Sequence, residues 1–308
     1  MTARVTIAIP CFNAARWISQ AVQSALDQTW PDKETIVVDD GSSDGSLAIL
    51  EGFAEKIRLI RTEHRGGNHA RNSALRAATG EWTQFLDADD FLLPKKVASQ
   101  FAEAANADAD CIFSPVLFDQ DGNRTPSEID ATRDAQTLWL AWQLPQTGGC
   151  LWRKSALEKI GGWNEATTCC QEFELYRRAI EAGLRFHFAP TPNAVYRVWS
   201  EGTLCRKEPR GIIEVRTELY RGFIAWLRER NQLTDEHLAL AGRACFEMAR
   251  TLAKLDPASA ARYHDERKRE QLIHLAGPAA PFSYRTAYRT FGFSFAEKLA
   301  STLHRRTG

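Results

Sequence analysis

An apolar run leads directly into three closely spaced carboxylates in the segment Gly80-Glu81-Trp82-Thr83-Gln84-Phe85-Leu86-Asp87-Ala88-Asp89-Asp90-Phe91. The aromatic and aliphatic residues up to Leu86 favour a buried strand. Asp87, Asp89 and Asp90 follow, and carboxylates this close repel one another unless a cation or a proton lies between them. Hard oxygen ligands suit Mg²⁺ or Mn²⁺, and open α/β sheets bind ligands where parallel strands end. The segment predicts a metal site, with an acidic loop that caps the next helix as the alternative.

The composition is that of an ordinary globular protein. The 308 residues are 44% hydrophobic and 25% charged, which allows one large or two moderate domains. The 39 Lys and Arg equal the 39 Asp and Glu, so no overall basic field points to nucleic acid. The seven cysteines are scattered, with one adjacent pair, and this argues against a zinc site or a disulfide framework. Since we find no signal peptide and no apolar run of about 18 residues, we expect a cytoplasmic protein.

Strand and helix patterns alternate in the first part of the chain. Short apolar runs indicate buried strands, and stretches with apolar residues at helical spacing separate them. Repeated βα units imply a mostly parallel sheet with right-handed crossovers, so the polar loops after successive strands should line one edge of that sheet. The expected strands are 5–10, 34–38, 57–60 and 82–86, and the expected helices are 17–26, 47–53 and 66–78.

Six motifs between residues 3 and 200 carry a resemblance to a known family. They are Val5-Thr6-Ile7-Ala8-Ile9-Pro10-Cys11-Phe12-Asn13, Val37-Val38-Asp39-Asp40-Gly41-Ser42-Ser43-Asp44, Ala70-Arg71-Asn72, Phe85-Leu86-Asp87-Ala88-Asp89-Asp90, Gly161-Gly162-Trp163-Asn164-Glu165 and Gln171-Glu172-Phe173-Glu174-Leu175. In this order and spacing they resemble the family 2 glycosyltransferases of the glycosyltransferase A fold, an α/β fold with a mostly parallel Rossmann-like sheet flanked by helices. The resemblance implies a catalytic domain over residues 1–205, with a nucleotide-sugar half at about 1–110 and an acceptor half at about 111–205.

The resemblance also implies a nucleotide site at the strand ends. Phe12 would stack on the base, with core packing as the alternative. Asp39 would accept a hydrogen bond from a uracil N–H, or serve only as a turn residue. Arg71 would reach the base or the diphosphate, or else form a surface ion pair. Asp87 would contact the ribose or a metal-bound water. The implied nucleotide-binding residues are Pro10, Phe12, Asp39, Arg71 and Asp87.

A divalent cofactor, Mn²⁺ or Mg²⁺, is implied by the same resemblance. Asp89 would ligate the ion that bridges the diphosphate, and Asp90 is the less certain second candidate. One departure from the family concerns Trp199, which stands where relatives often have a His. If that His helps to hold the metal or the diphosphate, Arg197 or the loop 200–203 would have to replace it.

The middle of the chain is expected to complete the donor site and to build the acceptor site. Gly148 and Gly149 resemble a Gly-rich segment beside the acceptor, where glycine lets the backbone approach a ligand, and the alternative is a plain turn. Trp152 and Trp163 either stack on sugar faces or pack in the core. The expected elements are a strand at 112–118, a turn at 119–123 and a short helix at 138–142.

The catalytic base is implied at a helix start. Family members usually carry a Glu-Asp pair there, with the Asp as base, and Gln171-Glu172 occupies that place in this chain. Glu172 would therefore be the base, one methylene longer, and a helix-start acid that interacts with the helix dipole is the alternative. Gln171 cannot titrate. Glu174 is the rival carboxylate, but a rotation of about 100° per residue turns it to a different side of the helix.

Beyond residue 205 the composition becomes rich in Ala, Arg, Glu and Leu, and we expect a helical region over 206–308. Helices are predicted at 213–227, 234–255 and 259–275, with Asp256-Pro257 separating the last two. The tail at 291–300 is apolar and is followed by the basic end 303–306. It either packs against its own domain or lies on an anionic membrane surface.

The resemblance implies an inverting, metal-dependent glycosyltransferase of polysaccharide biosynthesis. It would move a sugar from a nucleotide-diphosphate sugar, a UDP-sugar by preference, to a hydroxyl of a glycan or lipid-linked acceptor. We expect it in the cytoplasm, with peripheral contact at the inner face of the membrane. Two other classes stay open. One is a non-catalytic nucleotide-sugar-binding module, motivated by Gln171 and Trp199. The other is an Asp-x-Asp phosphatase, which would need the motif on the first strand.

Overall fold

The computed structural model describes residues 2–198 and 209–307, and it describes side chains as far as residue 302. The chain forms two compact units. The first consists of Met1–Trp139 with Gln143–Thr203, and the second consists of Leu140–Trp142 with Leu204–Gly308. The predicted domain boundary at residue 205 lies outside the described residues.

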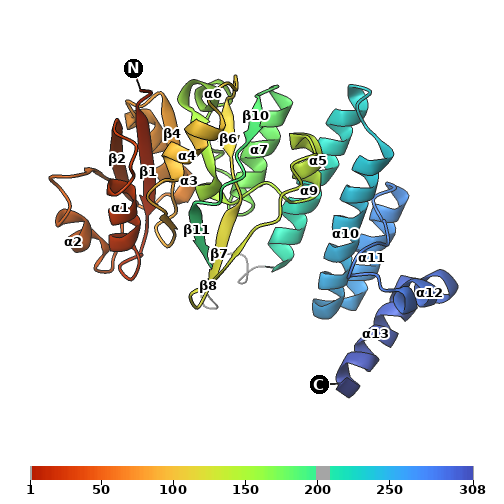
Figure 1. The fold of residues 1–308 in the computed structure, drawn as a ribbon. Coiled ribbons are helices and arrows are strands. Elements are labelled where there is room, and N and C mark those ends of the chain that lie inside the picture. Colours follow the sequence, from red (N-terminus) through yellow and green to blue (C-terminus); the bar gives the residue numbers. More distant parts are fainter. Residues whose placement is uncertain (1, 199–208, 308) are drawn as a thin grey trace. The chain divides into compact units, whose positions relative to one another are not determined.

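A seven-stranded sheet forms the centre of the first unit (Figure 1). Its strand order is β10-β6-β9-β4-β1-β2-β3, and neighbouring strands are parallel except where β9 is involved. The predicted mostly parallel sheet is thus confirmed, although the antiparallel insertion of β9 between β4 and β6 was not predicted. The strands are β1 Val5–Cys11, β2 Lys33–Asp39, β3 Arg58–Arg61, β4 Trp82–Phe85, β6 Cys111–Phe113, β9 Cys150–Arg153 and β10 Phe186–Phe188.

Helices flank this sheet (Figure 1). The connection from β1 to β2 and the connection from β3 to β4 run in opposite directions along the sheet, so right-handed crossovers put α1 and α3 on opposite faces. Helix α1 buries an apolar stripe at three- and four-residue spacing, as its sequence predicts. The helices are α1 Ile18–Leu26, α2 Ser46–Glu51, α3 Gly67–Ala77, α4 Lys96–Glu103, α5 Ala135–Leu140, η1 Thr147–Gly149, α6 Lys154–Lys159 and α7 Gln171–Glu181.

A smaller sheet of four strands corrects one prediction. The strand expected at 112–118 is two strands in two different sheets, because Pro115 has no N–H to donate and the chain turns at that point. The turn predicted at 119–123 joins the two strands of a hairpin. In the order β5-β11-β7-β8, the small sheet consists of β5 Phe91–Leu92, β11 Ala194–Arg197, β7 Val116–Gln120 and β8 Asn123–Pro126.

The second unit is helical, as predicted. Thr234 caps α10 by accepting a hydrogen bond from the His237 N–H at 3.2 Å, and Asp256 caps α11 with Pro257 at its first position. The helix predicted at 259–275 ends earlier, at Arg269, and the tail forms two further helices. The helices are α9 Pro209–Glu229, α10 Asp235–Leu255, α11 Pro257–Arg269, α12 Phe282–Phe291 and α13 Phe293–Thr307.

The tail packs in part against its own unit. Phe293 and Ala296 are buried, and the ring of Phe293 stacks on His264 with centroids 4.4 Å apart. Helices α12 and α13 therefore belong to the helical unit rather than extending from it. In the described parts of the chain, none of the helices combines the length and the apolar character needed to cross a membrane.

Gly80, at the start of the segment that leads into β4, gives a test of this packing. A Cβ on Gly80 would lie 2.6 Å from the Thr6 backbone nitrogen and 2.9 Å from the Trp82 carbonyl oxygen, so Gly80→Ala must push β1 and β4 apart. We expect it to lower the free energy of unfolding by about 1–3 kcal/mol, the usual range for overpacking. Urea unfolding of the full chain, followed by circular dichroism, measures the loss. A Cβ on Gly45 would meet only Ala15, at 3.7 Å, so Gly45→Ala is the matched control and should stay close to the parent. Equal stability of the two variants would contradict the packing argument.

Candidate active site

Two acidic residues lie at the end of β2, and they have different surroundings. Asp40 is 1% exposed and accepts hydrogen bonds from the backbone N–H groups of Arg65, at 3.1 Å, and Gly66, at 2.8 Å. It therefore holds the loop after β3. Asp39 is 3% exposed and accepts from the Ser42 N–H at 3.3 Å through Oδ2, while its buried Oδ1 has no hydrogen-bond partner among the described residues. Because a buried acceptor is costly to leave unpaired, Asp39 has capacity for a ligand N–H.

The loop after β1 presents Phe12 at the same edge of the sheet. Phe12 is 44% exposed, so the core-packing alternative is wrong. One face of its ring is already stacked on His64, with centroids 3.8 Å apart and planes 18° from parallel. The loops after β1 and β2 hold each other: Asn13 Oδ1 accepts from the Ser43 N–H at 2.8 Å, and the Asn13 N–H donates to Ser42 Oγ at 3.0 Å. Sequence reasoning missed His64, although its place after a third strand of the same edge was a signal.

Pro10 lies inside β1, in register with Val38 of β2, and is buried. Its ring therefore helps to set where β1 ends and the Phe12 loop begins. Proline has no N–H to donate to a neighbouring strand, but the pairing of β1 with β2 continues beside it, where the Asp40 N–H donates to the Cys11 carbonyl at 2.8 Å.

Arg71 on α3 contacts residues from several elements of the candidate site. Its side chain is 7% exposed, so the alternative of a surface ion pair is wrong about its location. The guanidinium donates to Asp87 Oδ1 at 2.6 Å, to Gln171 Oε1 at 2.8 Å and to Asn68 Oδ1 at 2.9 Å. It also lies over the Trp163 ring, 4.6 Å from the centroid. One planar fork thus joins the end of β4 to the start of α7.

The charges around Arg71 also identify its neighbours. Burial of the guanidinium lowers its pKa, but nearby carboxylates, Asp87 first and then Glu172 and Asp89, raise that pKa above its ordinary value. The carboxylates after β4 and the one on α7 therefore act on the same cation. The predicted metal-binding and catalytic acids are brought to one place.

The three carboxylates after β4 are not equivalent. Asp87 and Asp89 are half-buried, whereas Asp90 is 4% exposed and accepts a hydrogen bond from the Arg197 N–H at 2.9 Å. Burial, and then the negative charges of Asp89 and Asp87, raise the pKa of Asp90 well above its ordinary value. The Arg197 guanidinium donates to the Asp89 backbone carbonyl and to Gln20. Asp90 is therefore the poorer ligand candidate, and Arg197 orders the turn that carries Asp89.

Hard oxygen donors at a strand end are the right donor set for Mg²⁺ or Mn²⁺. Among the residues that the structure describes, no group of three or more His, Cys, Asp or Glu side chains forms a metal cage. Such a cage is unnecessary when a diphosphate supplies further oxygens, since one or two carboxylates then suffice. Asp89, with Asp87 beside it, fits that requirement. Trp199, where relatives often have a His, lies outside the described residues.

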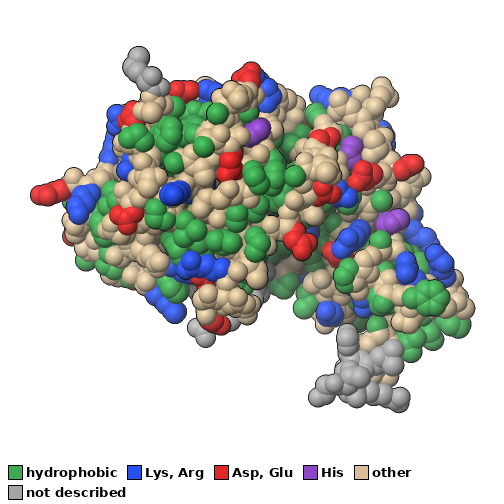
Figure 2. Space-filling view, in the orientation of Figure 1, with side chains coloured by type: hydrophobic (Ala, Val, Ile, Leu, Met, Phe, Trp, Pro, Cys, Tyr) green, Lys and Arg blue, Asp and Glu red, His purple; other side chains and the backbone are tan. Residues whose placement is uncertain are grey.

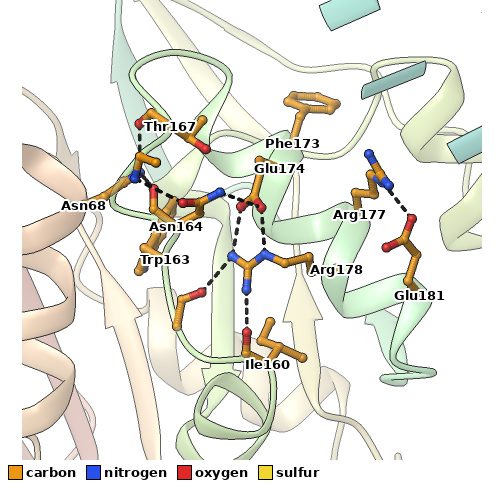
Figure 3. A network of polar contacts seen from close by, with 12 residues as sticks. Asn68, Ile160, Trp163, Asn164, Thr167, Phe173, Glu174, Arg177, Arg178 and Glu181 are labelled. Carbon is orange, nitrogen blue, oxygen red and sulfur yellow. Dashed lines mark hydrogen bonds and ion pairs between the residues drawn. The ribbon is translucent and has the colours of Figure 1, made fainter. Parts of the chain in front are cut away.

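The two candidate bases on α7 differ in what they bind. Glu172, in the first turn, accepts a hydrogen bond from the Thr147 hydroxyl at 2.6 Å. Glu174 makes a two-point ion pair with Arg178 at 2.7 and 2.8 Å, and Arg178 also donates to the Gly162 carbonyl at 2.7 Å (Figure 3). Glu174 thus has a structural role, because it orients Arg178, which binds the segment before α7. Sequence reasoning missed Thr147, because only the fold brings η1 to the start of α7.

The glycine segment before β9 is buried, which favours the turn alternative for Gly148 and Gly149. A Cβ on Gly149 would lie 2.5 Å from Pro145 Cβ. Buried glutamines hold the segment: Gln84 Nε2 donates to the Gly148 carbonyl at 3.1 Å, and Gln100 Nε2 donates to the Gly149 carbonyl at 3.0 Å. The two glycines therefore allow the close packing that positions Thr147.

Both candidate tryptophans are core residues. Trp152 is 2% exposed, and its ring packs against Tyr176 and Phe186 with centroids 6.0 and 5.7 Å away, so the expectation that it stacks on a sugar is not supported. Trp163 is 3% exposed and lies between Phe85 and the Arg71 guanidinium. Its role toward a ligand is indirect, through the orientation of Arg71.

Asn72 anchors the segment that carries Trp163. Its side chain accepts from the Trp163 N–H at 2.8 Å and donates to the Trp163 carbonyl at 2.8 Å. We expect Asn72→Ala to lower the free energy of unfolding by about 2–4 kcal/mol, because two buried backbone groups lose their partners. Hydrogen exchange of the full chain should show faster exchange at 161–165. Ser73→Ala, at the half-buried next position, is the control and should leave exchange unchanged. If Asn72→Ala leaves this segment as protected as the parent, the anchoring role is wrong.

The chain is similar to known proteins in both sequence and structure. The family model described as Glycosyl transferase family 2 matches residues 6–181. An uncharacterized glycosyltransferase of Nostoc sp., alr2836, is 31% identical over 170 residues, which cover 51% of this chain and 53% of the relative. UDP-Glc:alpha-D-GlcNAc-diphosphoundecaprenol beta-1,3-glucosyltransferase WfgD of Escherichia coli is 38% identical over 100 residues, 32% of this chain and 40% of the relative. The chain thus spans about half the length, or less, of these relatives.

Solved structures give the fold. Staphylococcus aureus TarS 1-349 in complex with UDP-GlcNAc has a TM-score of 0.61 at 17% identity and covers 87% of this chain and 90% of its own. The mannosyltransferase PcManGT from Pyrobaculum calidifontis, in complex with GDP-Man and Mn²⁺, has a TM-score of 0.56 at 19% identity and covers 98% and 87%. These likenesses confirm the predicted glycosyltransferase A fold. Since the family match extends over more than half of its residues, the chain belongs to glycosyltransferase family 2.

Proposed function

We propose that this protein is an inverting glycosyltransferase that uses a nucleotide-diphosphate sugar, a UDP-sugar by preference, and a divalent metal. The observation that carries the proposal is the double contact of Arg71, to Asp87 at 2.6 Å and to Gln171 at 2.8 Å. This contact ties the carboxylates suited to a metal and diphosphate to the helix that carries the candidate base. Such an arrangement supports group transfer better than nucleotide binding alone, for which a base at the start of α7 has no use.

The donor nucleotide would bind along the ends of β1 and β2. Asp39 Oδ1 is a buried acceptor without a partner among the described residues, which suits the N3–H of uracil. Phe12 offers the exposed face of a ring whose other face lies on His64. An aromatic stack of this kind contributes about 1–3 kcal/mol per base. The Arg71 cation would then attract the diphosphate, with Asp87 beside the ribose.

Asp89 would hold Mn²⁺ or Mg²⁺, together with oxygens of the diphosphate. When bound, the ion offsets the negative charge that grows on the leaving diphosphate. Asp87 keeps Arg71 oriented, and Arg197 keeps the Asp89 turn in place through the backbone. Asp90 is the less favoured ligand because it is buried under the Arg197 N–H.

Glu172 would act as general base toward the acceptor hydroxyl. Its place in the first turn of α7 puts this side chain at the positive end of the helix dipole. The Thr147 hydroxyl donates to Oε1 and so fixes the carboxylate, leaving Oε2 for the acceptor proton. The acceptor oxygen attacks the anomeric carbon from the face opposite to the diphosphate, and one displacement of this kind inverts that carbon.

The acceptor class is proposed from the relatives. One of them is named for a UDP-sugar donor and a diphosphoundecaprenol-linked acceptor. A glycan or lipid-linked hydroxyl in polysaccharide biosynthesis is therefore our proposal for this chain as well, at the cytoplasmic face of a membrane. If purified protein binds UDP-sugars but forms no product with any hydroxyl acceptor or water, the non-catalytic alternative replaces this one.

The metal proposal predicts that UDP binding depends on a divalent ion. Calorimetry should show at least about tenfold tighter UDP binding with Mn²⁺ than with EDTA. The reason is that Asp87 and Asp89 repel the negative diphosphate of UDP unless a cation lies between them. Asp89→Ala should remove that difference while the protein stays folded. Asp27→Ala changes an exposed carboxylate at the end of α1 and should keep the difference. Equal UDP affinity with Mn²⁺ and with EDTA in the parent would sink the metal role.

The nucleobase proposal predicts a binding defect without an equal chemical defect. Asp39→Ala removes a charge-assisted hydrogen bond, which is worth about 1.5–3 kcal/mol and corresponds to at least about a tenfold loss of UDP affinity. Turnover at saturating donor should change less than the affinity. Ser43→Ala, in the exposed loop nearby, serves as the control. Unchanged UDP affinity in Asp39→Ala would show that the assignment is wrong.

The catalytic proposal is tested by a pair of isosteric variants. Glu172→Gln keeps the size of the side chain and removes the proton acceptor, so the transfer rate should fall by about 10²–10⁴ with donor affinity retained. Glu174→Gln is the matched control two positions along α7. It weakens the ion pair with Arg178 and should lower stability more than it lowers the rate constant for transfer. A large rate loss only in Glu174→Gln would reverse the assignment, and full activity in both would exclude this helix as the source of the base.

A further inference from the structure

Helices α12 and α13 form a hairpin with one face turned into the helical unit. Tyr284 and Ala287 of α12 and Phe293 and Ala296 of α13 are at most 8% exposed. Their neighbours include Phe246 of α10, whose ring lies 5.7 Å from that of Tyr284. Since these contacts fix the inward face, the outward face of the hairpin is defined by the remaining residues.

The outward face is apolar to an unusual degree. Of the six large hydrophobic side chains that are exposed in the described part of the chain, four lie on this hairpin. Phe291 is 63% exposed, Phe295 46% and Leu299 43%. Phe282 is 79% exposed, but nine residues at about 100° each put it on the opposite side of α12 from Phe291. The rings of Phe291 and Phe295 touch, with centroids 4.5 Å apart, and Leu299 follows one turn later on the same face of α13. A cluster of this kind on an otherwise polar surface marks an interaction site.

The charged side chains of the hairpin that form no ion pair with described residues are all positive. Between residues 282 and 302 the only acid is Glu297, and it accepts hydrogen bonds from Arg250 and from the Tyr284 hydroxyl, both at 2.7 Å. Arg285, Arg289 and Lys298 form no ion pair with any described residue. In Figure 2, Lys and Arg side chains lie beside hydrophobic ones on the surface over α12.

The whole helical region has the same bias. Residues 206–308 contain 19 Lys and Arg and 12 Asp and Glu, whereas residues 1–205 contain 20 and 27. The neutral total therefore hides a basic region that carries the apolar face and an acidic region that carries the candidate active site. A field of this sign attracts an anionic surface.

We propose that the outward face of α12 and α13 docks on the surface of an anionic lipid bilayer. Phe291, Phe295 and Leu299, the contiguous cluster, would lie at the boundary between headgroups and acyl chains, as apolar side chains of interfacial helices do. The three cations would lie among the phosphates of the headgroups. A second copy of this chain is the weaker occupant, because pairing the two faces would bring like charges together. The inference does not depend on the proposed sugar transfer.

Vesicle sedimentation of the full chain tests the proposal. Vesicles of phosphatidylcholine mixed with phosphatidylglycerol should bind the protein at least about tenfold better than vesicles of phosphatidylcholine alone, and added salt should reduce the difference. Replacing the three cations together, as Arg285→Gln, Arg289→Gln and Lys298→Gln, should weaken binding about 100-fold, at about fivefold per cation.

The apolar side chains are tested separately. Phe291→Ala, Phe295→Ala and Leu299→Ala combined should also weaken binding by about 100-fold or more. Leu255→Ala and Arg228→Gln change an exposed apolar and an exposed basic side chain elsewhere in the same unit, and they should bind as the parent does. Circular dichroism and UDP binding, which should be the same in all variants, separate a docking defect from a folding defect or from failure of the proposed function.

Three outcomes would overturn the proposal. The first is equal binding to neutral and anionic vesicles, or binding to neither. The second is binding that survives both sets of three substitutions. The third is a dimer in vesicle-free solution that the apolar substitutions dissociate, since the face would then be occupied by a second copy.

Discussion

The buried guanidinium of Arg71 is the interaction on which the rest of the site depends. Taking a cation out of water is unfavourable, and hydrogen bonds with an opposite charge nearby offset the penalty. Here Asp87, Gln171 and Asn68 each accept one hydrogen bond from the terminal nitrogens, and the Trp163 ring covers one face of the guanidinium, while the buried Nε has no hydrogen-bond partner among the described residues. Because the fork is rigid and planar, these contacts fix the end of β4 and the start of α7 relative to each other, which a lysine ammonium would not do.

Buried polar side chains next to β4 also help to position the candidate site residues. Lys96 is 1% exposed and donates a hydrogen bond to Gln84. Burial lowers its pKa to about 7, which means that the charged ammonium is unfavourable at this position. Gln84 in turn holds the glycine segment, from which Thr147 reaches Glu172. The candidate base is therefore positioned by β4 and η1 as well as by its own helix, and it sits on rigid elements.

The sequence predicted what depends on local pattern. The βα alternation, the strand ends, and the positions of Asp39 and Asp87 follow from periodicity and from the order of the motifs. The antiparallel β9 was missed, since nothing local shows that Cys150–Arg153 inserts between β4 and β6. The same limit hid Thr147, whose partner Glu172 lies 25 residues away along the chain, and the stacking of His64 on Phe12 across two strands. A single strand over 112–118 is wrong because Pro115 breaks it into β6 and β7. The burial of Trp152 depends on tertiary packing, which no local pattern shows.

Gln171, at the position where the resemblance implies a Glu, is consistent with this description of the site. Gln171 Oε1 accepts the same kind of hydrogen bond from Arg71 that a carboxylate would accept, so the bridge from α3 to α7 is kept. A glutamate there would add a second negative charge next to Asp87 and directly before Glu172. With glutamine, Arg71 and Asp87 form a neutral pair, and the only carboxylate in the first turn besides the committed Glu174 is Glu172. Gln171 thus makes a structural contact that does not require a charge, while Glu172 supplies the carboxylate that the proposed chemistry requires.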